Sequence, residues 1–162
     1  MTAAGLPVPT LLEAAPFASG VVIRLSSTRF AIVTGSEAVA DVWKRLAPIA
    51  RPVGTPVWQW LDIRAGVPLI TQATTEAFVP QMASIDKIGG VSFHKGCYPG
   101  QEIVARTQYL GKVKRHLYRI HAAGSTVAGA AIHTPESPEH PCGMVVNAAP
   151  SPDGRFEALA VI

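Results

Sequence analysis

The sequence predicts an α+β protein, and three features support that prediction. Two short β-branched runs, 21–25 and 29–33, flank the polar turn 26–28, which is typical of a β-hairpin. Ser36 resembles the N-cap of a helix over 37–46, so two strands and a packed helix would form one α+β layer. After Gly111, many short strands alternate with glycine-containing turns, which favours a small C-terminal β-barrel.

The remaining segments are assigned from turn residues and periodicity. Residues before 19 are expected to be extended or frayed. Thr55 and Pro56 mark a helix start, because proline suits a first helical turn, and 57–65 is expected to form a short helix or a helix-to-strand crossover. The runs 67–70 and 91–93 are predicted as strands, and 101–109 as a helix ended by Gly111. Pro80 argues against a regular helix in 78–82, and 144–146 should pair with 158–162 across the turn 151–154. A domain boundary is expected near Gly111.

Composition narrows the classes of protein. With 48% apolar and 15% charged residues, a chain of 162 residues can bury a core and leave apolar surface for a partner. A net charge of +3 suits a small anionic molecule better than dedicated nucleic-acid binding. We expect a cytoplasmic protein, since no signal peptide, membrane-spanning run or set of disulfide cysteines is visible. The histidine and cysteine spacing predicts no metal site.

The stretch 94–106 places a lone cysteine, Cys97, in a turn between Gly96 and Gly100, just before the predicted helix. The free N–H groups and dipole of a helix N-terminus favour a thiolate, which is the reactive form of cysteine. Lys95 and His94 add positive charge nearby. Two interpretations stay open: a reactive thiol, or a small residue that fits the turn. A Cys–His hydrolase is disfavoured, because no orienting third group or oxyanion site is visible.

Other polar residues have equally open interpretations. Glu102 could accept a hydrogen bond from a ring N–H, and Gln101 can both donate and accept. Gln81 could face a pocket or lie in a loop that covers the core. A basic run could bind phosphates or a polyglutamate tail, although such runs are more often solvated strand faces. That run contains Lys112, Lys114, Arg115, His116 and Arg119.

The block 95–102, K-G-C-Y-P-G-Q-E, strongly resembles the K-G-C-Y-x-G-Q-E signature of the YgfZ family. These are folate-binding proteins related to the aminomethyltransferase (T-protein) of the glycine cleavage system. Further stretches resemble family blocks in the expected order, so that the resemblance covers most of the chain from residue 21 onward. These stretches are 62–68, 78–81, 90–93, 104–106 and 146–150.

The resemblance implies tetrahydrofolate as ligand and a role in the assembly or repair of iron–sulfur enzymes. Through an iron–sulfur methylthiotransferase, that role reaches tRNA modification. Iron–sulfur enzymes or assembly factors are the implied protein partners, with no membrane, and the modest charge disfavours direct tRNA binding. Cys97 is the family's motif cysteine and the expected reactive thiol. The positions matching the same block, and expected to bind the folate, are Lys95, Tyr98, Gly100, Gln101, Glu102 and Arg106.

The resemblance also implies an architecture. Residues 1–110 would form part of a ferredoxin-like unit and of the central, T-protein-like folate-binding domain, and 111–162 the C-terminal β-barrel. An additional N-terminal segment, present in family chains, would pack on this one. The aminomethyltransferase's catalytic aspartate belongs to that segment, which favours a non-enzymatic assembly factor. The aminomethyltransferase remains the alternative, and a ligand-free docking module and a tRNA-binding protein are further rivals.

Overall fold

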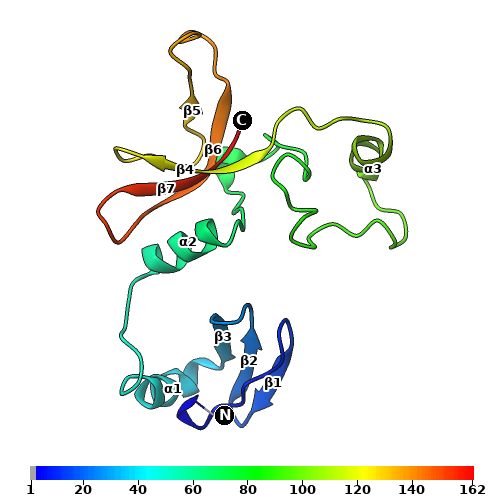
Figure 1. The fold of residues 1–162 in the computed structure, drawn as a ribbon. Helices are drawn as coiled ribbons and strands as arrows, with labels where there is room; N and C mark the ends of the chain where they lie inside the picture. Colours follow the sequence, from blue (N-terminus) through cyan, green and yellow to red (C-terminus); the bar gives the residue numbers. More distant parts are fainter. Residues whose placement is uncertain (1–2) are drawn as a thin grey trace. The chain divides into compact units, whose positions relative to one another are not determined.

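The computed structural model describes residues 3–162, which belong to two compact units, Met1–Val53 and Gly54–Ile162 (Figure 1). Each unit contains a β-sheet and at least one helix, so the α+β class is confirmed. The ferredoxin-like and T-protein-like topologies, and the division into domains near Gly111, stay predictions. Within the described residues, none of the helices combines the length and apolar character needed to cross a membrane.

The first unit is built on a three-stranded antiparallel sheet in the order β1–β2–β3. Its strands are β1 (Ala14–Phe17), β2 (Gly20–Arg24) and β3 (Phe30–Thr34). The β2–β3 pair confirms the predicted hairpin, and Val22 on the central strand is buried. Of the two alternatives for the segment before residue 19, extended or frayed, residues 14–17 are extended, because their backbone pairs with β2.

Helix α1 (Val39–Leu46) follows β3 through a single 3₁₀ turn, η2 (Ser36–Ala38). The predicted Ser36 cap is not made: Gly35 precedes the 3₁₀ turn, and neither helix has a side-chain capping bond. On α1, Val42 is buried, whereas Val39 and Trp43 are exposed. The Arg45 side chain ties α1 to the short 3₁₀ turn η1 (Ala3–Gly5), because its Nη2 donates to the carbonyl of Ala4 at 2.9 Å.

The second unit contains a four-stranded antiparallel sheet in the order β4–β7–β6–β5. Its strands are β4 (Leu117–Ala122), β5 (Ala131–Ile132), β6 (Gly143–Pro150) and β7 (Phe156–Val161). The β6–β7 hairpin is the predicted pairing across the turn near 151–154. Within residues 3–162 these strands form an open sheet, in which β4 and β5 are the edges, so a closed barrel stays a prediction.

The β6–β7 hairpin accommodates two irregular residues. The register shifts by one residue between Val145 and Asn147, which leaves Val146 as the extra residue of a β-bulge. Pro150 lies opposite Phe156, next to the hydrogen-bonded pair in which the N–H of Ser151 donates to the carbonyl of Arg155 at 2.8 Å. Since hydrogen-bonded and non-hydrogen-bonded pairs alternate, Pro150 needs no N–H for the ladder to β7.

The core of the second unit lies between this sheet and helix α2 (Thr55–Arg64). Pro56 lies in the first turn of α2, as predicted, and Ile63 near its end is fully buried against the sheet. Burial of one such side chain is worth about 1.5–3 kcal/mol. The core consists of Ile63, Val146, Ala149, Leu159 and Val161, with Trp60, Phe78, Met82 and Leu117 packed against it.

Turns and one helix occupy the segment between α2 and the sheet. Helix α3 (Gln101–Tyr109) has the predicted bounds, and 78–82 is irregular, as expected. The strands predicted over 67–70 and 91–93 are absent from the described chain, and both predictions are wrong. A short 3₁₀ turn, η3 (Gln72–Thr74), follows the first of them, and its Thr71 and Thr74 side chains form a reciprocal capping box.

Candidate functional site

The motif turn enters α3 through a left-handed residue. Gly100 has φ of +81° and ψ of 0°, a conformation that glycine adopts without steric cost. The Gln101 side chain then folds back, because its Oε1 accepts the N–H of Tyr98 at 3.2 Å. The backbone N–H of Gln101 donates to the Tyr98 carbonyl at 3.3 Å. Gly100 and Gln101 therefore shape the turn that presents Tyr98.

Lys95 and Tyr98 lie together on this turn, with Cys97 between them in sequence. The Lys95 Nζ lies 4.5 Å from the centroid of the Tyr98 ring, a cation–π arrangement. Cys97 is exposed and its thiol is free. Within residues 3–162, no group of three or more His, Cys, Asp or Glu side chains gathers as metal ligands. The turn thus presents a cation, an aromatic face and an accessible thiol.

Lys95 and Tyr98 line a hollow of 360 Å³, here called the motif hollow. One wall is Val104 of α3, and the other is the turn-rich segment between 80 and 92. The side chains are mostly apolar, and the two glycines of the wall expose backbone. The remaining lining residues are Pro80, Ile85, Gly89, Gly90, Val91 and Ser92.

Two buried side-chain oxygens without partners belong to the segment that forms one wall of the motif hollow. Gln81 is only 5% exposed, and its Nε2 donates to the carbonyl of Val104 at 2.7 Å. The Gln81 Oε1 is buried and has no hydrogen-bond partner among the described residues, and the same holds for Oδ1 of Asp86. Both residues follow directly after lining residues, Pro80 and Ile85. Buried acceptors without partners are uncommon and indicate a place for a donor.

The sequence points to only one of these two acceptors. It predicts Gln81 either in a pocket or in a covering loop. In the structure Gln81 anchors α3 and follows Pro80, which lines the motif hollow. Asp86 does not stand out in the sequence. In the sequence, Asp86 is marked only as an acidic residue between Ile85 and Ile88, in a stretch with no clear periodicity.

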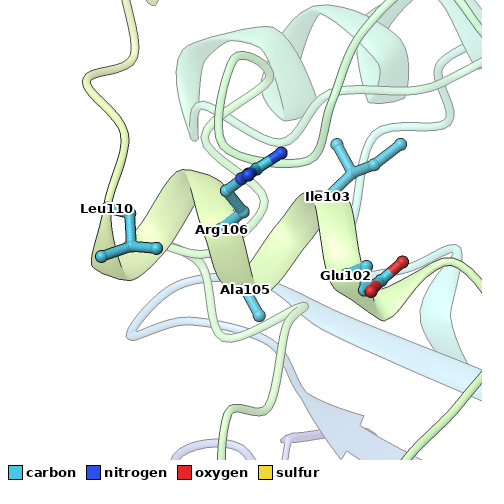
Figure 2. Close-up of a pocket in the computed structure, with 5 residues that line it drawn as sticks. All are labelled: Glu102, Ile103, Ala105, Arg106 and Leu110. Atoms are coloured by element: carbon cyan, nitrogen blue, oxygen red, sulfur yellow. The ribbon is translucent and has the colours of Figure 1, made fainter.

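Glu102 and Arg106 line a second hollow of 460 Å³, the α3 hollow, rather than the motif hollow. Figure 2 shows that its five lining residues all belong to α3 and its C-terminal end, with Ile103 and Arg106 projecting toward the same side. Ile103 and Leu110 are 63% and 84% exposed, whereas Val104 of the same helix is buried. The structure thus divides the predicted residues between two sides of α3.

The predicted basic run stands apart from both hollows. Lys112, Lys114, Arg115 and His116 are exposed and line neither of them. Arg119 lies on β4, where its Nε is 3.9 Å from Oε2 of the buried Glu157. An anionic tail in the motif hollow would therefore meet Lys95 before it meets this run.

The motif hollow suits a planar, partly apolar ligand with N–H donors and a negative tail. Tyr98 offers an aromatic face and Lys95 a positive charge, and the wall segment contains the unpaired acceptors of Gln81 and Asp86, each one residue after a lining residue. A volume of 360 Å³ falls in the usual range of small-molecule sites.

Comparison with known proteins identifies relatives of this chain. No protein-family model matches it. The tRNA-modifying protein YgfZ of Yersinia pestis (strain Pestoides F) is 42% identical over 106 residues, which cover 65% of this chain and 32% of that protein. The YgfZ of Cronobacter sakazakii (strain ATCC BAA-894) is 39% identical over 103 residues, or 64% and 31% of the two chains. The chain thus spans about a third of the length of these curated relatives. The identity across this shared region shows that the chain belongs to the YgfZ family.

Proposed function

We propose that this chain provides part of a tetrahydrofolate-binding protein that supports the assembly or repair of iron–sulfur enzymes in the cytoplasm, and through them tRNA modification. The observation that carries the proposal is the motif hollow, which an aromatic ring and a cation line and whose wall segment contains two buried acceptors without partners. The name of the relatives, tRNA-modifying protein, supports the link to tRNA.

The chemistry of folate fits these groups. The pterin ring carries an amino group and a ring N–H side by side, and a carboxylate such as Asp86 can accept both. The amide oxygen of Gln81 can accept a further N–H, and Tyr98 provides a surface for the aromatic part of the ligand. The glutamate tail is negatively charged, and Lys95 would attract it. Glu102 and Arg106 would bind folate only if the ligand also extends into the α3 hollow.

Titration calorimetry of the 162-residue chain with tetrahydrofolate tests the binding step. We expect saturable binding that weakens about tenfold in Asp86→Asn and in Tyr98→Ala, since each removes one contact worth about 1–1.5 kcal/mol. Tyr118→Ala is the matched control, because Tyr118 is exposed on β4 and lines neither hollow. Equal affinity of all four proteins would contradict this site.

The proposed role of Cys97 rests on its exposure beside the ligand-binding turn. A free thiol at that position can attack an electrophile or bind iron or a sulfur carrier once it is deprotonated. In a strain that lacks its own YgfZ, we expect Cys97→Ser to lose support of iron–sulfur enzyme activity while folate binding is retained. Cys142→Ser is the control, since the Cys142 thiol donates to the carbonyl of Ile132 at 3.3 Å. Full support by Cys97→Ser would exclude a thiol role.

A further inference from the structure

Strand β4 has an open edge whose free groups follow from the register. At the end of the β4–β7 ladder, the N–H of His116 donates to the carbonyl of Ile162 at 2.8 Å, and the N–H of Ile162 donates to the carbonyl of His116 at 3.0 Å. This reciprocal pair is a hydrogen-bonded pair of an antiparallel ladder, and such pairs alternate with non-hydrogen-bonded ones.

The alternation assigns each β4 residue to one of two sides. Tyr118 and Ile120 are opposite Ala160 and Ala158, and their backbone groups point toward β7. The N–H and C=O groups of Leu117, Arg119 and His121 therefore point to the outer edge. Within residues 3–162, no strand pairs with that edge. An edge with free N–H and C=O groups can pair with an added strand.

A positively charged hollow lies against the start of this strand. It measures 490 Å³ and is here called the basic hollow. Three cationic side chains line it from three different elements: Arg64 at the end of α2, Lys87 in the following turns, and Arg119 on β4. Its exposed apolar surface comes from Ile88 and Leu117, and the buried Ile63 and Leu159 lie beneath it. Ala65, Gly66 and Ser84 complete the lining.

The two arginines of the basic hollow are positioned by one buried carboxylate. Glu157 is 6% exposed, and its Oε1 accepts the indole N–H of Trp60 at 3.0 Å. The Arg64 guanidinium lies 5.1 Å from the centroid of the Trp60 ring, and Arg119 Nε lies 3.9 Å from the other Glu157 oxygen. No acidic side chain lines the basic hollow in the part of the chain that the structure describes, so the hollow keeps an excess of positive charge.

We propose that the β4 edge and the basic hollow together bind an acidic, extended segment of a partner protein. The segment adds to the sheet as a strand beside β4 and hydrogen-bonds to Leu117, Arg119 and His121. Because side chains alternate along a strand, every second residue of the segment faces the side of the sheet that carries Arg119. Glu or Asp at those positions would meet Arg64, Lys87 and Arg119. This inference is independent of folate binding.

An acidic strand would use both the open β4 edge and the basic hollow, whereas a nucleic acid would use only the hollow. Phosphates would be attracted to the three cations but would leave the row of backbone donors and acceptors unused. Backbone pairing provides affinity and alternate side chains provide selectivity, which is the usual division of roles in strand addition. The apolar surface at Ile88 and Leu117 would bind the methylene groups of the acidic side chains.

Three synthetic peptides test the proposal with the 162-residue chain. The first alternates Glu with Val, the second replaces each Glu by Gln, and the third keeps the first sequence but carries N-methyl groups on alternate backbone nitrogens. By fluorescence anisotropy we expect saturable binding of the first peptide only. Equal binding of the Gln peptide would exclude a role for the basic hollow, and equal binding of the N-methylated peptide would exclude edge pairing.

Variants of the chain test the contribution of the charges and that of the backbone hydrogen bonds separately. Lys87→Glu is expected to weaken binding of the Glu–Val peptide about tenfold, because Lys87 is exposed and a negative charge there repels the acidic peptide. His121→Pro removes one edge N–H and adds ring bulk at the edge, and should abolish binding. His121→Val keeps that N–H and should bind within about twofold of wild type. Unchanged binding in both Lys87→Glu and His121→Pro would overturn the proposal.

Hydrogen exchange identifies the docking edge directly. In the free chain, the amides of Tyr118 and Ile120 should exchange slowly and those of Arg119 and His121 quickly; peptide binding should slow only the second pair. The same protection in concentrated protein without peptide, with dimers in sedimentation, would assign the edge to a second copy of the chain and overturn the proposal. A single-stranded RNA oligonucleotide that competes fully with the peptide would also overturn it.

Discussion

At the scale of single residues, the hydrogen bond between Trp60 and Glu157 connects the core to the basic hollow. Trp60→Phe keeps the apolar ring but removes the only N–H that donates to the buried Oε1 of Glu157 among the described contacts. A buried acceptor of this kind costs about 1–3 kcal/mol when it loses its donor. We expect urea denaturation to show a loss of unfolding free energy in that range. Trp43→Phe, at an exposed position, should change it little, and equal losses in the two variants would contradict this account.

Asp153, in the β6–β7 turn, makes the free energy of unfolding depend on pH. The Ser151 hydroxyl donates to its carboxylate, and Arg155 adds side-chain hydrogen bonds at 2.9 and 2.7 Å and a backbone hydrogen bond at 3.2 Å. These contacts hold the pKa of Asp153 far below its usual value. A lowered folded-state pKa contributes stability above the unfolded pKa of about 3.9, and that contribution is lost as the pH falls toward the folded pKa.

Comparison of wild type with Asp153→Asn tests whether this stabilisation is lost on acidification. We expect wild type to be the more stable protein at neutral pH, by a constant margin that starts to shrink below about pH 5. Urea unfolding at a series of pH values measures the margin, and an NMR titration of the carboxyl carbon measures the pKa directly. A margin that grows on acidification would show that the carboxylate is not stabilised in the folded state.

At the scale of elements, the start of α3 depends on one backbone conformation. Gly100 has a positive φ, and a Cβ added there would meet no atom within 4 Å, so Gly100→Ala would add backbone strain without a clash. The left-handed conformation costs an alanine about 1–2 kcal/mol. Gly96 lies in the same turn, has equally open space and no positive φ, and Gly96→Ala is the matched control. We expect a lower melting temperature for Gly100→Ala alone, measured by circular dichroism. Equal melting temperatures of the two variants would contradict this role of Gly100.

Elements with local signals were predictable. Pro56 after Thr55, the glycines around 101–109 and the turn before Phe156 mark α2, α3 and the β6–β7 hairpin in the sequence itself. The runs 67–70 and 91–93 have strand-like composition, but within residues 3–162 no neighbouring strand offers them hydrogen bonds. Strand formation depends on a partner, and composition does not supply one. For the same reason the sequence does not predict β1, which lies in a segment rich in Pro and Ala.

At the scale of the whole molecule, the two compact units differ in the size of their cores. The second unit has a continuous core between α2 and the sheet, whereas the first buries only a few apolar side chains, among them Leu6, Val22 and Val42. We expect the fragment 54–162 to unfold cooperatively on heating, and the fragment 1–53 to show no cooperative transition, because small cores rarely offset chain entropy. Calorimetry of both fragments measures this, and a cooperative transition of 1–53 would contradict it.

The sequence motif of the candidate site was predictable, but the three-dimensional arrangement of its residues was not. The block 95–102 contains the turn, and the sequence alone placed Cys97 ahead of a helix. The separation of Tyr98 from Arg106 by α3 could not be predicted, because it depends on which side of the helix faces the segment 80–92. The buried oxygens of Gln81 and Asp86 depend on the same packing. Tertiary contacts between irregular segments leave no periodic trace in sequence.

The open edge of β4 also bears on how the chain behaves at high concentration. Unpaired edges promote aggregation, and proteins commonly protect them with charged side chains. Here Arg119 and His121 lie along the edge, and Lys114 and Arg115 precede it, so two copies that approach edge to edge would repel each other. That repulsion is strongest at low salt. High salt would screen the charges and leave the free backbone groups unprotected. Storage at low ionic strength should therefore keep the protein in solution longest.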